Sequence, residues 1–104
     1  MTAHAIGPLA ALWDGDMIAA EVGGVKLVVV RLGDAVHAYA DRCAHLGVAL
    51  SEGVLDGGIL TCAAHHWQYD AATGQGVNPR TACLARYPVS IESGVIYVEI
   101  AGRA

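Results

Sequence analysis

The sequence predicts a single all-β domain, a sandwich or a small barrel, that spans residues 1–104. Short apolar runs alternate with glycine-containing turn signals along most of the chain, and this spacing is typical of all-β domains. No window of about 12 residues keeps a helical period free of glycine and β-branched residues. With 55% hydrophobic and 15% charged residues, the composition is that of a folded chain with one modest core.

The predicted strands follow one another as hairpins. Residues 17–22 and 25–32 flank the turn Gly23-Gly24, as in a β-hairpin. Residues 35–40 follow the turn Gly33-Asp34 and alternate apolar with polar side chains, which predicts a half-buried strand. Two more hairpins are expected, one from residues 54–55 and 59–62 around the turn 56–58, the other from residues 87–92 and 95–100 around the turn 93–94.

Composition and charge exclude several classes of partner. Ten acidic and six basic residues give a formal net charge of −4, whereas phosphate binding relies on a surplus of Lys and Arg. No run approaches the roughly 20 apolar residues of a membrane span. Residues 1–12 lack the basic and long apolar regions of a signal peptide. We therefore expect a cytoplasmic protein that binds neither nucleic acid nor membrane.

Two cysteine–histidine pairs carry the chemistry. Cys43 and His45 form a C-x-H step, and Cys62 and His65 form a C-x-x-H step. Two thiolates and two imidazoles make a four-ligand set for a metal or a cluster. Zinc sites usually keep the two cysteines in one pair and the two histidines in the other, and the mixed pairs here depart from that pattern. A redox-inactive zinc-binding interaction module is therefore the less favoured alternative. Mixed pairs suit a two-iron cluster in which two histidines replace two cysteines on one iron.

These pairs make the chain resemble the Rieske [2Fe–2S] proteins, whose signature is C-x-H, a spacer and C-x-x-H. The similarity spans about residues 13–100 and is closest to the ferredoxin components of toluene- and alkene-type multicomponent monooxygenases. It implies an antiparallel β-sandwich or small barrel with two cluster-binding loops at one end, and one [2Fe–2S] cluster. The stretches similar to that subgroup are residues 50–53, 57–62, 67, 74–79 and 87–89.

The resemblance also implies roles for the four ligands and for the protein. Cys43 and Cys62 would bind the buried ferric iron, and His45 and His65 would bind the outer, reducible iron. The protein would be a monomeric one-electron carrier and not an enzyme. It would take electrons from an NADH-dependent flavin/iron–sulfur reductase and pass them to the di-iron hydroxylase of an aromatic or alkene monooxygenase. A ring-hydroxylating dioxygenase is the alternative acceptor.

The same resemblance implies a low reduction potential within the Rieske range of about −150 to +300 mV. High-potential members have a disulfide at the positions of Val48 and Ala64, and a serine that donates a hydrogen bond to a sulfide at the position of Trp67. Losing such bonds lowers the potential. Tyr69 matches a tyrosine of the high-potential members that donates a hydrogen bond to a ligand sulfur. This match predicts that Tyr69 raises the reduction potential modestly.

Other residues have plainer interpretations. His66 is expected to be a solvated strand residue, His4 and His37 surface histidines, and Cys83 a buried structural thiol. Trp67 is expected either to pack in the core or to lie at a docking face. Residues 78–79 are expected to form a third loop or a simple turn. Five charged residues flank the motifs and predict either an acidic rim that steers partners or a merely solvated face: Asp41, Arg42, Glu52, Asp56 and Asp70.

Overall fold

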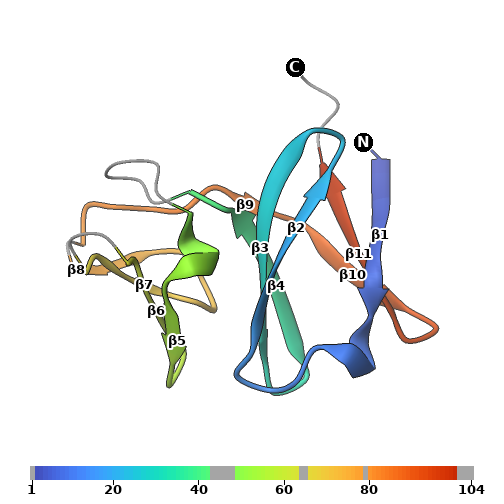
Figure 1. The fold of residues 1–104 in the computed structure, drawn as a ribbon, viewed down its shortest axis with the longest axis horizontal. Coiled ribbons are helices and arrows are strands. Elements are labelled where there is room, and N and C mark those ends of the chain that lie inside the picture. The colour runs from blue at the N-terminus through green and yellow to red at the C-terminus, as the bar shows by residue number, and fades with distance from the viewer. Residues whose placement is uncertain (1, 43–48, 64–65, 79, 101–104) are drawn as a thin grey trace.

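The computed structural model describes residues 2–42, 49–63, 66–78 and 80–100, which form three antiparallel sheets (Figure 1). Sheet A has the order β1-β11-β10, with β1 (Thr2–Pro8), β11 (Val95–Ile100) and β10 (Val89–Glu92). Sheet B has the order β2-β3-β4-β9, with β2 (Met17–Val22), β3 (Val25–Leu32), β4 (Ala35–Ala40) and β9 (Arg86–Tyr87). Sheet C has the order β5-β6-β7-β8, with β5 (Val54–Asp56), β6 (Ile59–Thr61), β7 (Gln68–Asp70) and β8 (Gly76–Asn78). The helical content of these residues is two short 3-10 turns, η1 (Leu9–Ala11) and η2 (Leu50–Glu52), and no described helix is long and apolar enough to cross a membrane.

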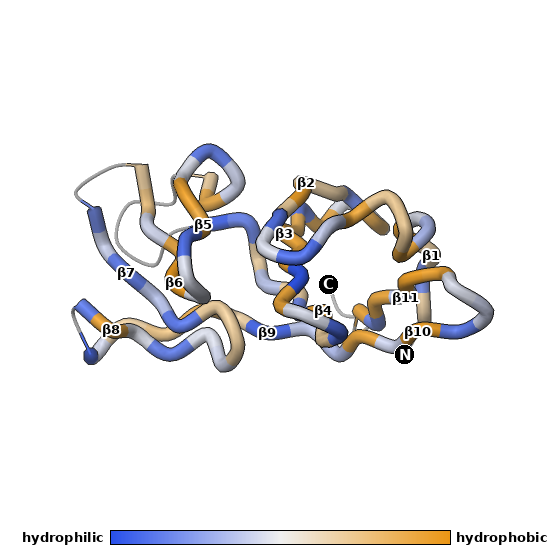
Figure 2. The backbone as a smooth tube through the Cα atoms, turned by 90° about the horizontal axis from the view of Figure 1, so that it is seen from below, coloured by the Kyte–Doolittle hydropathy of each residue, from blue (hydrophilic) through white to orange (hydrophobic). Residues whose placement is uncertain are grey.

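Sheet B is the middle layer of the molecule, with sheet A on one side and sheet C on the other (Figures 1 and 2). Its strand β3 is buried on both faces. Leu27 and Val29 pack into a core shared with sheet A, whereas Val28 and Val30 pack into a second core shared with sheet C. This explains the continuous apolar run of β3, because a strand covered on both faces does not alternate with polar residues. The expected all-β sandwich is confirmed.

Strand β4 differs from the predicted half-buried strand at Tyr39. Its ring lies fully buried in the core shared with sheet C, and its hydroxyl donates a hydrogen bond to the Ala71 carbonyl oxygen at 2.7 Å. Gly74 lies against the same ring, where a Cβ atom would come within 2.8 Å of Tyr39 Cε1. The alternation of apolar and polar residues along β4 would predict a solvated face if the protein had two layers. Here sheet C forms a third layer and covers that face.

Burial raises the pKa of Tyr39 to about 12 from the ordinary value of 10.0, which predicts a pH dependence of stability. The folded protein holds the phenol proton more tightly than the unfolded chain does. The resulting stabilisation is therefore present below pH 10 and is lost as the pH rises to 12. We expect the free energy of unfolding to fall by about 1 to 2 kcal/mol over this interval. Urea unfolding at pH 9.5 and 11.5 checks it. Tyr39→Phe is expected to be less stable at both pH values and to show a smaller decrease between them, and an equal decrease would contradict the assignment to Tyr39.

The three predicted hairpins are present, but the predicted strand 87–92 is wrong as one element. It is divided at Pro88 into β9, which pairs with β4, and β10, which pairs with β11. Proline lacks the N–H that a continuous ladder needs, so the chain leaves sheet B there and enters sheet A. Strand β1 was not predicted; it pairs with β11, with a register shift between Ala5 and Gly7.

Sheet C is inserted in the chain between β4 and β9, which are themselves neighbours in sheet B. Tyr39 pairs with Arg86 across these two strands, and the Ala40 N–H donates to the Ala85 carbonyl oxygen at 2.9 Å. The chain therefore leaves sheet B after β4, builds sheet C, and returns beside its point of departure. The segment that carries both cysteine–histidine motifs is held at its base by this pairing.

Candidate metal centre

One end of sheet C carries the second motif. Val54 pairs with Thr61, Thr61 with Gln68 and Gln68 with Asn78, so these residues form a row across the four strands. Cys62 follows Thr61 directly beyond this row. Its backbone N–H donates to the Trp67 carbonyl oxygen at 2.7 Å. This bond brings Cys62 and Trp67 together, and His65 lies between them in the sequence.

Cys62 is fully buried in the core between sheets B and C. Leu50, Leu60 and Tyr69 belong to the same core, and Trp67 packs against it half-buried. A thiolate in such a place is shielded from water and is a soft ligand suited to iron or zinc. The residue type, its burial and its position at a sheet end fit a cluster ligand. Trp67 agrees in part with the core-packing expectation, because it packs against the core but is only half-buried.

Cys43, His45 and His65 lie outside the described residues. The residues on either side of them are Arg42, Ala49, Ala63 and His66. Across the described ranges, no three His, Cys, Asp or Glu side chains come together as a group that could hold a metal ion. The structure therefore places one of the four predicted ligands, Cys62, and gives no competing site among the residues it describes.

A contact that the sequence did not predict spans the first motif. Asp41 Oδ1 accepts a hydrogen bond from the Ser51 backbone N–H at 2.7 Å, and Oδ2 accepts one from Ser51 Oγ at 2.6 Å. Asp41 follows β4 and Ser51 lies in η2, so the contact joins the residues before and after segment 43–48. We call this pair of bonds the Asp41–Ser51 clamp.

Gly53 brings η2 close to the strand that precedes Cys62. A Cβ atom on Gly53 would overlap the carbonyl oxygen of Thr61, the residue before Cys62. Its φ of −87° is open to any residue, so glycine is needed here for space and not for backbone freedom. The sequence similarity had included residues 50–53 without a role for them, and this close approach supplies one for Gly53.

Cys83 is exposed, so the prediction of a buried structural thiol is wrong. It forms a β-bridge with Gln75, and its neighbours Ala82 and Leu84 are buried. Side chains alternate between the two sides of an extended chain, so two inward neighbours turn Cys83 outward.

Two of the histidines outside the motifs, His66 and His37, differ in part from expectation. His66 is exposed as predicted, but it lies in a turn with a left-handed φ of 56° and not in a strand. His37 is half-buried, and Arg86 Nη2 donates a hydrogen bond to its Nδ1 at 3.3 Å. Burial, followed by the positive charge of Arg86, lowers the pKa of His37 below its ordinary 6.5. His37 is therefore no simple surface histidine.

The five charged residues near the motifs do not form one rim. Asp56 and Asp70 pair with Ile59 at the end of sheet C opposite Cys62. Asp56 ends β5 and Asp70 ends β7, and each of these strands is three residues long. Each aspartate therefore lies at the end of the sheet that is farther from Cys62, although it is close to a motif in the sequence. The carboxylate of Asp41 is engaged by Ser51. Arg42 and Glu52 remain as exposed charges near the first motif. Asn78 ends β8 in the row beside Cys62, and Pro79 lies outside the described residues.

Tyr69 is buried in the same core as Cys62, which keeps its predicted hydrogen bond to a ligand sulfur testable. Tyr69→Phe is expected to lower the midpoint potential by about 20 to 60 mV. The free energy of one hydrogen bond is about 0.5 to 1.5 kcal/mol, and a one-electron couple shifts by about 59 mV per tenfold change. Protein-film voltammetry of both proteins checks it. We expect the wild-type midpoint in the lower half of the Rieske range, and an unchanged midpoint in Tyr69→Phe would contradict the role of the hydroxyl.

Comparison with known proteins gives one family. A model of the Rieske [2Fe-2S] domain matches residues 2–88. The ferredoxin component of the alkene monooxygenase system of Xanthobacter autotrophicus is 40% identical over 88 residues, covering 84% of this chain and 72% of that protein. Ferredoxin CarAc of Metapseudomonas resinovorans is 37% identical over 78 residues, covering 74% of this chain and 73% of that protein. A chain in the solved complex of reduced oxygenase and oxidized ferredoxin in carbazole 1,9a-dioxygenase superposes with a TM-score of 0.84 at 31% identity, over 92% of this chain and 91% of that one.

Proposed function

The chain belongs to the Rieske [2Fe-2S] domain family, and from that membership we propose which residues hold its cluster and which proteins it serves. A Rieske domain carries one Rieske-type [2Fe–2S] cluster, and this replaces the zinc alternative. Its relatives include ferredoxin CarAc and the ferredoxin components of alkene monooxygenase and naphthalene 1,2-dioxygenase systems. The chain is accordingly an electron carrier of an oxygenase system and not a catalytic enzyme.

We propose that Cys43 and Cys62 bind one iron and that His45 and His65 bind the other. The mixed C-x-H and C-x-x-H pairs support this assignment, as does the burial of Cys62 at the end of sheet C. When bound, the cluster supplies a one-electron couple that is easier to reduce than a four-cysteine cluster, because two neutral imidazoles replace two thiolates. Leu50, Leu60 and Tyr69 exclude water from the Cys62 side of the site.

For the partners, we propose an NADH-dependent reductase as donor and the di-iron hydroxylase of an alkene or aromatic monooxygenase as acceptor. The observation that carries this choice is the 40% identity to the alkene monooxygenase ferredoxin component. We further propose that residues 1–104 act as one domain, as a monomer, in the cytoplasm.

A ring-hydroxylating dioxygenase is the second candidate acceptor. It is supported by the 37% identity to ferredoxin CarAc and by the structural similarity to a chain of the carbazole 1,9a-dioxygenase complex. Both acceptors need the same one-electron carrier, so they differ only in the protein that docks.

Cross-linking of the cluster-loaded protein in a lysate of its source cells tests the acceptor. The captured protein would then be purified, its subunits and iron identified, and its rate of reoxidation of the reduced carrier measured by stopped flow. A multi-subunit di-iron hydroxylase that oxidises the carrier supports the proposal. An oxygenase with its own Rieske cluster and mononuclear iron would move the protein to the dioxygenase systems.

A further inference from the structure

We propose that Asp41 is a positioning residue for the cluster ligands and acts through Ser51. The proposal rests on the ligand set proposed above, because Cys43 and His45 belong to segment 43–48 between these two residues. One carboxylate accepts two hydrogen bonds from Ser51, at 2.7 Å from the backbone N–H and at 2.6 Å from Oγ. Hydrogen bonds to a carboxylate are short and stronger than neutral ones. The clamp therefore fixes the distance between the two ends of this ligand segment.

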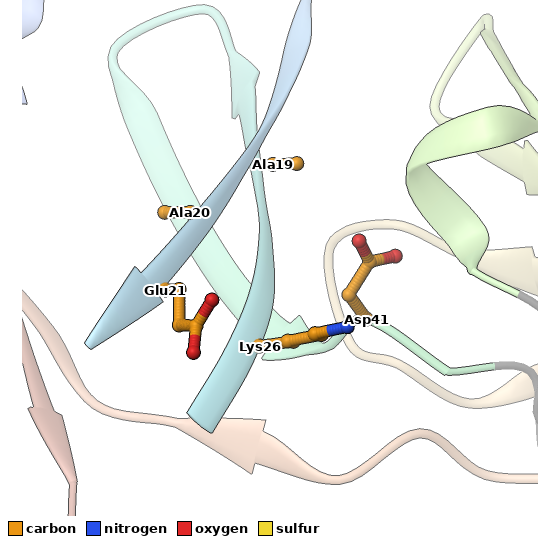
Figure 3. Close-up of a pocket in the computed structure, with 5 residues that line it drawn as sticks. All are labelled: Ala19, Ala20, Glu21, Lys26 and Asp41. Carbon is orange, nitrogen blue, oxygen red and sulfur yellow. The ribbon is translucent and has the colours of Figure 1, made fainter. Parts of the chain in front are cut away.

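Asp41 is anchored to sheet B through its backbone. Its N–H donates to the Lys26 carbonyl oxygen at 3.0 Å, and Lys26 lies in β3. Asp41 and Lys26 also line one shallow hollow of about 300 Å³, together with Glu21 and two alanines (Figure 3). Asp41 is thus held beside the middle sheet by its backbone, while its carboxylate is bound by Ser51 of η2.

Ser51 is anchored on the other side to the part of sheet C that carries Cys62. Its neighbour Leu50 is fully buried in the same core as Cys62. The turn η2 closes through the Gly53 N–H, which donates to the Leu50 carbonyl oxygen at 2.9 Å, and Gly53 lies against Thr61. A continuous line of contacts therefore runs from β3 through the clamp and η2 to the residue before Cys62. Through it, the Asp41 carboxylate sets the position of the first ligand segment relative to the second.

The test measures how fast the cluster is lost to an iron chelator, followed by the decay of visible absorbance. Ser51→Ala removes the Oγ bond, and the half-time is expected to shorten about tenfold. Asp41→Ala removes both bonds, and about a hundredfold is expected. Ser51→Thr keeps a hydroxyl and is expected to restore the wild-type rate. The double variant is expected to match Asp41→Ala alone, because the two residues share one interaction.

A matched control separates positioning from charge. Glu52 is the next residue in η2, is exposed, and its side chain makes no hydrogen bond within the described part of the chain. Glu52→Ala removes the same charge as Asp41→Ala and is expected to leave the half-time unchanged. The electron paramagnetic resonance spectrum of the reduced protein is expected to shift in Asp41→Ala and not in Glu52→Ala, which a general loss of stability would not produce.

The outcomes distinguish the clamp from the ligand set. Wild-type cluster loss in Ser51→Ala and Asp41→Ala, with Cys62→Ala devoid of cluster, would overturn the clamp and leave the ligands standing. A full cluster in Cys62→Ala would overturn both. If Asp41→Ala does not fold, Ser51→Ala compared with Ser51→Thr decides, and equal half-times in these two would overturn the proposal.

Discussion

Cys62→Ala is expected to purify without its cluster, with iron and acid-labile sulfide below about a tenth of the wild-type content. Cys62 is fully buried directly after β6, so no water or neighbouring exposed residue can take the place of its sulfur. The three remaining proposed ligands leave one iron with a single protein thiolate. Colorimetric iron and sulfide assays, together with the visible spectrum, measure the effect.

Cys83→Ala is the matched control for this substitution. It removes the same atom from the same chain, but Cys83 is exposed and belongs to neither motif. We expect its iron and sulfide content to equal that of the wild type. A reversed result, in which Cys83→Ala is colourless and Cys62→Ala is not, would place the cluster elsewhere in the fold.

Gly53→Ala is expected to lower the free energy of unfolding by about 3 kcal/mol or more, an effect at the upper end of those known for overpacking. The added Cβ would overlap the Thr61 carbonyl oxygen, and neither atom can rotate away, because the Gly53 backbone fixes the Cβ and the oxygen belongs to the Thr61 backbone. The β5–β6 pairing starts at Val54 and Thr61 and must shift to make room. Urea unfolding followed by circular dichroism measures the loss, and the half-time of cluster loss is expected to shorten with it.

Gly57→Ala provides the comparison for Gly53→Ala. Gly57 has a left-handed φ of 60° in the β5–β6 turn, and no atom lies within 4 Å of a Cβ placed there. Its substitution therefore strains the backbone without any overlap and is expected to lower the free energy of unfolding by about 1 kcal/mol. Equal losses in the two variants would mean that the contact with Thr61 does not matter.

The hairpins were predictable because their turn residues are local signals. Gly23 and Gly24 both have positive φ, as a tight turn between β2 and β3 requires, and Gly57 and Gly58 do the same between β5 and β6. Strand β1 gave no such signal, since its pairing with β11 joins opposite ends of the chain. The burial of Tyr39 was equally out of reach, because it depends on a sheet that the alternation within β4 does not encode.

The candidate site was likewise predictable only in part from the sequence. The spacing of Cys62 and His65 predicted a ligand, and the burial of Cys62 fits that prediction. The Asp41–Ser51 clamp joins residues ten positions apart, a spacing for which no sequence rule exists. The burial of Cys83 was predicted from the general behaviour of cysteine, and the inward neighbours Ala82 and Leu84 overrode that tendency.

The insertion of sheet C between β4 and β9 has a consequence for how such carriers diversify. The segment between β4 and β9 starts and ends at two adjacent, paired strands. The pairing of these two strands can therefore stay the same when the segment between them changes. Residues 41–85 can accordingly be exchanged between related chains as one cassette, provided that the side chains facing Val28, Val30 and Tyr39 keep their volume. The segment that carries both cysteine–histidine motifs can thus evolve separately from the sheets that support it.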